Sequence, residues 1–95
     1  MIIARRFLVV GRVQRVGFRY FTEETARLEG VGGFVRNLPD GRVEALAEGE
    51  ADAVLRFERA IRHGPPGARV DGVETEILEP VGRSTFVVGP SRHET

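Results

Sequence analysis

One short stretch limits the folds open to this chain more than any other: an apolar run that passes through a glycine-bounded loop into a helical pattern. The apolar run is residues 7–10, the loop occupies about residues 12–18, and the helical pattern follows. An unbroken run of β-forming residues is typical of a strand inside a sheet rather than at its edge. The sequence therefore predicts a central strand whose end leads directly to the N-terminus of a helix.

This loop has the features of an anion-binding site. The first turn of a helix presents backbone N–H groups without partners inside the helix, and the helix dipole adds positive potential there. Consecutive loop amides can form a concave nest for phosphate oxygens. Arg19 adds a permanently charged planar fork that can hold two oxygens at once. An ordinary strand-to-helix connection with a surface arginine fits the loop equally well, so the loop alone does not decide.

The rest of the chain continues an alternation of strands and helices. The predicted helices cover residues 19–30 and 51–63, and the predicted strands cover residues 5–12, 33–38, 42–48, 69–78 and 84–88. A Pro39-Asp40-Gly41 turn joins the second and third strands into a hairpin. This order predicts an α+β ferredoxin-like βαββαβ sandwich, with an antiparallel sheet, two helices on one face and a short extra C-terminal strand of unassigned position.

Composition limits the size, location and partners of the protein. Ninety-five residues suffice for a single domain spanning residues 1–95, in which polar residues 89–95 are expected to form a mobile tail. The absence of cysteine and the presence of only two histidines argue against a metal site. No apolar run is long enough for a membrane span or a signal peptide, so we expect a cytoplasmic protein without a membrane partner. The net charge of zero gives no attraction to nucleic acid.

Two further expectations concern side chains outside the loop. The first helix is expected to bury one stripe of residues three and four positions apart, made up of Phe18, Phe21, Thr25 and Leu28. The carboxylates of Glu44, Glu48 and Glu50 are expected on a solvated face rather than in acid–base catalysis.

Two long motifs in this chain resemble the signatures of the acylphosphatase family. The first signature is similar to Gly11-Arg12-Val13-Gln14-x-Val16-x-Phe18-Arg19, and the second is similar to Gly33-Phe34-Val35-Arg36-Asn37 followed by Gly41-x-Val43 and Gly49. Residues 64–70 also resemble those of bacterial members. The resemblance covers nearly the whole chain, and two long motifs at matching separation are far more specific than one glycine-containing loop.

The resemblance implies an enzyme that hydrolyses the carboxyl–phosphate bond of small acyl phosphates without a metal or a cofactor. Arg19 matches the phosphate-binding arginine of the family, and Asn37 matches the catalytic asparagine that holds the attacking water. The phosphate cradle of the family matches the backbone amides of Gln14, Arg15, Val16, Gly17 and Phe18. A monomer is the expected state, and the physiological acyl phosphate is not specified.

The chemistry of an acyl phosphate suits these residue types. Its carboxylate leaves without a strong general acid, so positioning and electrostatic stabilisation are the remaining tasks. A neutral carboxamide such as that of Asn37 orients water without bringing negative charge near the phosphate, and no histidine or cysteine in the motifs suggests a covalent intermediate. Asn37 also has a purely structural explanation, as a turn-forming residue before Pro39-Asp40-Gly41.

The chain departs from the family at Arg15, where glycine is usual. If this position needs a positive φ, an arginine there costs on the order of 1 kcal/mol. Its amide then still belongs to the cradle, or else its side chain adds positive charge at the mouth of the site and tightens phosphate binding. The sequence leaves both explanations open.

Two other functions fit the predicted topology. RNA-recognition modules share it, but they stack bases on aromatic residues of their central strands, and the predicted strand 42–48 has acidic residues instead of aromatic ones. The second alternative is an acylphosphatase-like module that binds its ligand without turning it over, since similar domains occur within larger maturation proteins. Because Arg19 and Asn37 are both present, the sequence favours hydrolysis.

Overall fold

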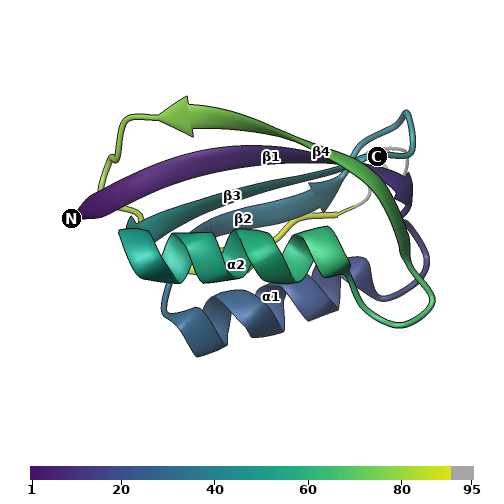
Figure 1. Cartoon of the computed structure of the whole chain (residues 1–95), viewed down its shortest axis with the longest axis horizontal. Helices are drawn as coiled ribbons and strands as arrows, with labels where there is room; N and C mark the ends of the chain where they lie inside the picture. The colour runs from purple at the N-terminus through teal and green to yellow at the C-terminus, as the bar shows by residue number, and fades with distance from the viewer. Residues whose placement is uncertain (91–95) are drawn as a thin grey trace.

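The structure, a computed structural model, describes residues 1–90 and confirms the predicted order of helices and strands (Figure 1). Strand β1 (Ile2–Arg12) leads to helix α1 (Phe18–Glu29), which is followed by the hairpin of β2 (Gly32–Asn37) and β3 (Val43–Glu50). Helix α2 (Ala51–His63), strand β4 (Arg69–Leu78) and the short strand β5 (Phe86–Val88) complete the chain. The bounds of α2 and β4 agree with the prediction, whereas β1 begins earlier than predicted.

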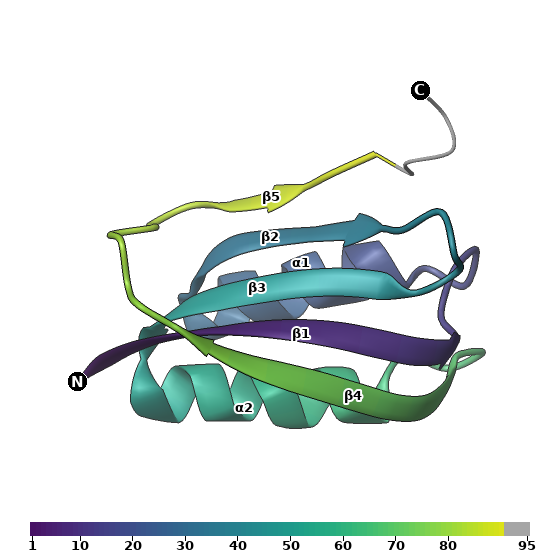
Figure 2. The ribbon, with the colours of Figure 1, turned by 90° about the horizontal axis from the view of Figure 1, so that it is seen from above.

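The five strands form one sheet in the order β4-β1-β3-β2-β5, which Figure 2 shows from above. Strands β1 and β3 are interior, as the apolar run in β1 predicts. The pairs among β1 to β4 are antiparallel, and β5 adds a parallel pair along β2 with Gly33 beside Phe86. The N–H of Gly33 also donates to the carbonyl of Thr85 at 2.8 Å, which fixes the start of β5 against β2.

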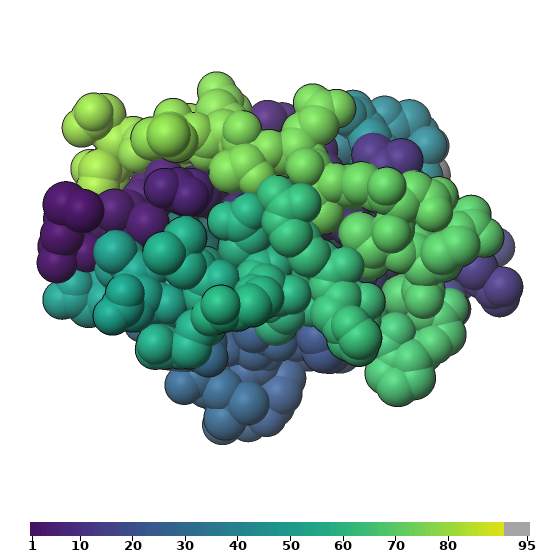
Figure 3. Space-filling model, viewed as in Figure 1, coloured from purple at the N-terminus to yellow at the C-terminus, as the bar shows by residue number. Residues whose placement is uncertain are grey.

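Both helices pack on one face of this sheet, and the hydrophobic core lies between them and the strands (Figure 1). The ring of Phe57 in α2 has its centroid 5.9 Å from that of Phe7 in β1 and 5.9 Å from that of Phe86 in β5. Burying such a side chain contributes about 1.5–3 kcal/mol to the stability of the fold. Through these two ring contacts, Phe57 holds α2 both to an interior strand and to an edge strand. In the space-filling view, α2 covers the middle of the molecule, with β4 above it and α1 below (Figure 3).

The predicted buried stripe of α1 is confirmed only at Phe18. The helix buries Phe18, Thr22 and Ala26, while Phe21 and Thr25 are half-buried and Leu28 is 72% exposed. A helix turns about 100° per residue, so residues at steps of four from Phe18 form the inward face and Leu28 points away from it. The apolar pattern did not include Thr22, because threonine is polar. The Thr22 hydroxyl donates to the carbonyl of Phe18 at 2.8 Å, so this side chain can be buried.

The expectation that Glu44 and Glu48 lie on a solvated face is wrong. They are only 4% and 2% exposed, although they do lie on the sheet face opposite the helices. The carboxylate of Glu44 accepts hydrogen bonds from the Nε of Arg6 and the Nε of Arg36, both at 2.5 Å. Burial acts to raise the pKa of Glu44, but these two guanidinium groups outweigh it and the pKa lies below its ordinary value. Arginine side chains thus cover the carboxylate on this face.

The Glu48 carboxylate holds the segment that connects the two edges of the sheet. This connection leaves β4 at one edge and reaches β5 at the other, so its backbone needs hydrogen-bond partners outside the sheet. Glu48 accepts bonds of 2.6–3.1 Å from the N–H groups of Val81, Gly82 and Arg83, and one of 2.9 Å from Nη1 of Arg83. Burial acts to raise the pKa of Glu48, but these donors outweigh it and lower the pKa.

Replacing Glu48 by glutamine should therefore destabilise the fold in a pH-dependent way. Because the folded state lowers the pKa of Glu48, its ionised form stabilises the fold above the ordinary pKa of 4.5, and this stabilisation disappears as the pH falls through the lower folded value. We expect the Tm of Glu48→Gln to lie roughly 10 °C below that of the wild type at pH 7, with the gap narrowing towards pH 3. Thermal unfolding followed by circular dichroism measures this.

The matched control is Glu79→Gln, since Glu79 is exposed and makes no hydrogen bond within residues 1–90. It should leave the Tm unchanged across the same pH range. A Tm gap for Glu48→Gln that stays constant from pH 7 to pH 3 would contradict the assigned role of the carboxylate.

Candidate active site

The topology of the sheet brings the predicted site residues to one end of the molecule. Strand β3 pairs antiparallel with both β1 and β2, so β1 and β2 run in the same direction and finish at the same end of the sheet. The loop after β1 and the turn after β2 are seen together at that end (Figure 2). Asn37, the last residue of β2, is thereby brought near the loop of residues 12–18.

A small pocket of about 110 Å³ lies between this loop and the end of β2. Its lining residues are Val13, Arg15, Gly17, Phe18, Arg19, Tyr20 and Asn37. Arg19 and Asn37 thus contribute to one pocket although they belong to different elements. The volume is a few times the roughly 30 Å³ that a water molecule occupies in the liquid, and far below the roughly 300–1,000 Å³ of sites for larger ligands. The pocket therefore suits a small head group such as a phosphate.

The chain leaves β1 for this loop through a bulge at Gly11. The register of β1 with β4 shifts between Val10 and Gly11, and Gly11 has a φ of 138°. A Cβ at this position would lie 2.0 Å from the carbonyl oxygen of Arg69, so only glycine fits. Such a bulge turns the strand away from its partner and directs the following residues out of the sheet.

The N-terminus of α1 presents unneutralised positive potential to the pocket. The first helical hydrogen bond runs from the N–H of Phe21 to the carbonyl of Gly17, so the N–H groups of Phe18, Arg19 and Tyr20 have no acceptor within the helix. Gly17, with a φ of 77°, is the N-cap and has no side chain to accept from them. The first turn of α1 also contains no acidic residue that would offset the helix dipole.

Arg19 is held at the edge of the pocket by the segment after β5. Its Nη1 donates to the carbonyl of Gly89 at 2.7 Å, and the N–H of Gly89 in turn donates to the carbonyl of Val35 at 2.7 Å. An arginine has five N–H donors, so this bond orients the guanidinium and leaves donors for a ligand. The predicted mobile tail begins at this glycine, and its residues 91–95 lie outside the described part of the chain.

Asn37 is fixed by the tight turn that follows it. It is 4% exposed, lies opposite Val43 in the sheet, and precedes a hydrogen bond of 2.8 Å from the N–H of Leu38 to the carbonyl of Arg42. The predicted turn role of Asp40 is confirmed, because its carboxylate accepts from the N–H of Arg42 at 3.1 Å. The hairpin thus fixes the backbone position from which the Asn37 side chain extends.

The side chain of Gln14 links the loop to this hairpin, a role that the sequence did not predict. Its Nε2 donates to the carbonyls of Leu38 and Arg42 at 2.8 and 2.9 Å. The sequence assigned only the backbone amide of Gln14 to the site. No local pattern signals such a contact, because both partners lie more than twenty residues further along the chain.

The residues of the predicted amide cradle do not all line the pocket. Arg15, Gly17 and Phe18 do, and Gly17 necessarily does so with its backbone. The side chain of Gln14 is bonded to the hairpin, and Val16 packs against the hydrophobic core. For all five residues, an amide contact with the ligand stays a prediction.

Arg15, which stands where the family usually has glycine, does adopt the left-handed backbone conformation. Its φ is 62°, and among residues 1–90 no other residue except glycine has a positive φ. The loop therefore keeps the backbone geometry that a glycine would adopt, and arginine takes it at a steric cost of about 1 kcal/mol.

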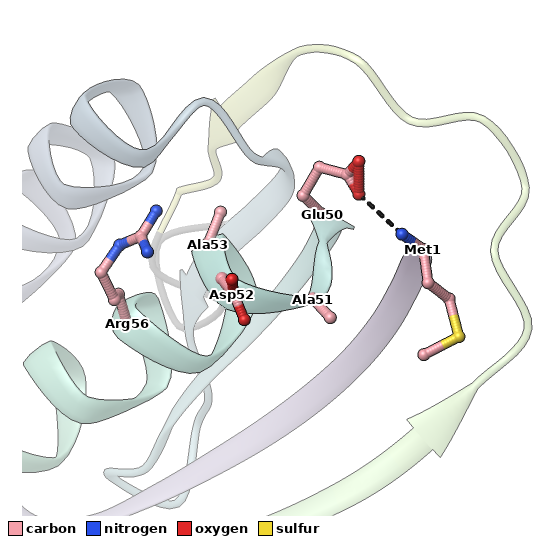
Figure 4. A pocket seen from close by; sticks show the side chains of 6 residues that line it. All are labelled: Met1, Glu50, Ala51, Asp52, Ala53 and Arg56. Atoms are coloured by element: carbon pink, nitrogen blue, oxygen red, sulfur yellow. Dashed lines mark hydrogen bonds and ion pairs between the residues drawn. The ribbon is translucent and has the colours of Figure 1, made fainter.

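A larger hollow of about 510 Å³ lies at the opposite end of the sheet, where α2 begins (Figure 4). There the Met1 ammonium lies 3.0 Å from the Glu50 carboxylate, and Asp52 and Arg56 also line the wall. Both cations of this hollow are already paired, Met1 with Glu50 and Arg56 with Glu29, and Asp52 adds a negative charge, so the smaller pocket beside Arg19 is the better phosphate site.

No metal site or membrane-crossing helix is found in the described part of the chain. Residues 1–90 contain no group of three or more histidine, aspartate or glutamate side chains placed to hold a metal ion. None of the helices there has the length and apolar composition needed to cross a membrane.

Replacing Arg15 by glycine and by alanine separates backbone strain from side-chain effects. Both variants lack the guanidinium, but only glycine adopts the φ of 62° without a steric cost. We expect the free energy of unfolding of Arg15→Gly to exceed that of Arg15→Ala by about 1 kcal/mol in urea denaturation. At Arg12, the last residue of β1, the order should be reversed: Arg12→Ala should have a higher free energy of unfolding than Arg12→Gly. An Arg15→Gly variant no more stable than Arg15→Ala would contradict the left-handed assignment.

Replacing Gln14 by alanine should loosen the hairpin that carries Asn37. Two hydrogen bonds to backbone carbonyls are lost, so we expect the free energy of unfolding to fall by about 1–2 kcal/mol and the amide of Leu38 to exchange faster with deuterium. Gln14→Glu keeps the length of the side chain but cannot donate, and it should show the same acceleration. An unchanged exchange rate at Leu38 in both variants would exclude this link.

Comparison with known proteins agrees with this geometry. The sequence profile of the acylphosphatase family matches residues 5–88. A protein of Anaeromyxobacter dehalogenans named acylphosphatase is 54% identical over 80 residues, which make up 84% of this chain and 86% of that protein.

Solved structures confirm the ferredoxin-like fold. The crystal structure of acylphosphatase from Bacillus subtilis has a TM-score of 0.88 and 38% identity, covering 94% of this chain and 99% of that one. Full-length HypF, solved in a phosphate- and nucleotide-bound form, has a TM-score of 0.87 and 30% identity over 96% of this chain but only 12% of its own length. With a family match over most of its length, this chain belongs to the acylphosphatase family, enzymes that hydrolyse acyl phosphates to a carboxylate and inorganic phosphate.

Proposed function

We propose that acyl phosphates are hydrolysed in the pocket between the residue 12–18 loop and the end of β2. In this proposal Arg19 and the backbone N–H groups of residues 14–18 bind the phosphoryl group, and Asn37 positions the attacking water. The observation that carries it is that Arg19 and Asn37 line the same pocket of about 110 Å³. A pocket of this size accepts a phosphoryl group and one water, while the acyl group extends outward.

The phosphoryl group is held by donors that are already in place. The N–H groups at the start of α1 have no helical acceptors, and the bond from Arg19 to the Gly89 carbonyl holds the guanidinium at the pocket. Fixed donors of this kind stabilise the charge on the three equatorial oxygens in the transition state without having to reorganise. This electrostatic contribution is the main source of rate enhancement in the proposed mechanism.

The reaction itself is an in-line displacement at phosphorus. The oxygen of the bound water forms a bond to phosphorus while the bond between phosphorus and the acyl oxygen breaks, and its electron pair leaves with the carboxylate. The proton released by the water passes to a phosphoryl oxygen, so the products are a carboxylate and protonated inorganic phosphate. No protein group needs to act as a strong acid, because the carboxylate is a stable leaving group.

The Asn37 carboxamide is suited to aim this water. Its side chain is buried at the end of a strand, and the backbone beside it is held by the hairpin turn and by Gln14. A neutral amide both donates and accepts hydrogen bonds, so it can orient a water molecule without repelling the phosphate. Precise placement of a nucleophile contributes several kcal/mol to catalysis, about 7–11 kcal/mol in the best oriented systems.

Replacing Arg19 and replacing Asn37 should impair hydrolysis in different ways. We expect Arg19→Ala to lower kcat/KM for benzoyl phosphate by at least about 100-fold and to abolish competitive inhibition by inorganic phosphate, since it removes oxyanion binding. We expect Asn37→Ala to lower kcat by a similar factor while inorganic phosphate still inhibits, since it removes only the placement of water. Steady-state kinetics with and without inorganic phosphate measures both effects.

Arg59→Ala is the matched control, because Arg59 is exposed on α2 and does not line the pocket. It should behave as the wild type in rate and in phosphate inhibition. Near-native turnover by a folded Arg19→Ala or Asn37→Ala variant would remove that residue from the mechanism. Inhibition by phosphate without any turnover in the wild type would instead indicate a binding module that is not catalytic.

We also expect a cytoplasmic monomer. The monomer is the state expected of a small acylphosphatase. The cytoplasmic location rests on the sequence alone, whose apolar runs are all shorter than a membrane span or a signal-peptide core.

A further inference from the structure

We propose that Arg15 selects acyl phosphates whose acyl group carries a second negative charge. This inference rests on the proposed function, because it takes the pocket beside Arg19 as the phosphoryl site. In this proposal the Arg15 guanidinium meets the anionic substituent at the mouth of the pocket, after the phosphoryl group has been bound inside it.

The first argument comes from the distribution of ion pairs. All basic residues of the chain other than its two histidines are arginines, and within residues 1–90 most of them lie within 4.0 Å of a carboxylate. The described arginines without a carboxylate partner are Arg12, Arg15, Arg19 and Arg59. All but Arg59 lie between the end of β1 and the start of α1. The unneutralised positive charge is therefore concentrated at the pocket.

The second argument comes from the backbone at Arg15. A glycine would adopt its φ of 62° without steric cost, so the loop geometry does not require a side chain here. The guanidinium makes no hydrogen bond or ion pair within the described residues, so the fold does not use it either. Strained positions of this kind concentrate at ligand sites. The cost of the left-handed arginine is therefore explained by what its side chain offers to a ligand.

The third argument comes from the size of the pocket. A volume of about 110 Å³ accepts the phosphoryl group but not an acyl group as well. The acyl group must then extend out of the pocket, and Arg15, an exposed residue, is among the residues that line it. Arg19 is half-buried and bonded to the Gly89 carbonyl, so it stays with the phosphoryl group. Of the two cations that line the pocket, Arg15 is therefore the one left to meet the acyl group.

The substrate class that fits is an acyl phosphate with an anionic group on the far side of its carbonyl. Such a group can be a carboxylate, as in the monophosphate of a dicarboxylic acid, or a phosphate. An exposed guanidinium attracts either one, and Arg is suited to both by its planar fork of donors. Because this contact is exposed to solvent, its effect on substrate selectivity should be modest and should weaken as the salt concentration increases.

The test compares substrates that differ only in charge. The probes are 4-carboxybenzoyl phosphate, its neutral isostere 4-carbamoylbenzoyl phosphate, and 4-phosphonobenzoyl phosphate. For each enzyme the selectivity is the kcat/KM of a charged probe divided by that of the neutral probe. We expect the selectivity of Arg15→Gln and Arg15→Gly to lie about three- to fivefold below that of the wild type, through a higher KM for the charged probes. The carboxylate and phosphonate probes show which anion is preferred.

Two matched controls isolate the position of the charge. Arg12→Gln removes an unpaired arginine from the same stretch of chain that does not line the pocket, and Arg59→Gln removes one from α2. Both should keep the wild-type selectivity at low salt. In the wild type the selectivity should fall towards that of Arg15→Gln as sodium chloride is added.

Two outcomes would overturn the proposal. One is unchanged selectivity in both Arg15 variants; if kcat/KM falls by the same factor for charged and neutral probes, Arg15 acts on the phosphoryl group. The other is an equal loss of selectivity in Arg12→Gln, which would indicate a general effect of charge. A failure of the proposed function is recognised separately, because Arg19→Ala would then hydrolyse all of the probes at the wild-type rate.

Discussion

The candidate site depends on one constraint, the placement of β3 between β1 and β2. Because β3 pairs antiparallel with both, the two flanking strands finish at the same end of the sheet, and one carries the loop while the other carries Asn37. The core residues Phe7, Phe57 and Phe86 hold this arrangement by packing α2 across the sheet. A hydrophobic core of ordinary composition therefore determines the positions of two polar residues that are far apart in sequence.

Hydrogen bonds between distant segments refine what the core has positioned. Gln14 joins the loop to the hairpin, and the Gly89 carbonyl orients Arg19 from the end of β5. The Glu48 carboxylate in turn holds the connection that brings β5 to its edge of the sheet. These contacts are polar and directional, so each restricts a backbone or side-chain position more narrowly than apolar packing does. The pocket is therefore supported by carboxylate, carboxamide and carbonyl groups that are not themselves expected to touch the substrate.

The fold could be predicted from the sequence because it depends on local signals. The apolar run in β1, the turn at residues 39–41 and the glycine and proline residues after α2 determine where elements begin and end, and the bounds of α2 and β4 agree with the structure. The environments of Glu44 and Glu48 could not be predicted, because their burial depends on arginines and amides from other strands and loops. The same is true of Gln14. The buried face of α1 was misjudged because Thr22 is polar and Leu28 is apolar, whereas position on the helix decides which of them is buried.

The weakest element of the sheet has a direct connection to the chemistry. Strand β5 has three residues and lies at the edge, beside a single neighbouring strand, so it belongs to the part of a protein that opens with the least free energy. When it detaches, the Gly89 carbonyl leaves with it and Arg19 loses its anchor. Phe86 leaves Phe57 as well, whereas Phe57 keeps its contact with Phe7. If Arg19 binds the phosphoryl group as proposed, activity on gradual heating depends on the attachment of β5 and not only on the packing of the core.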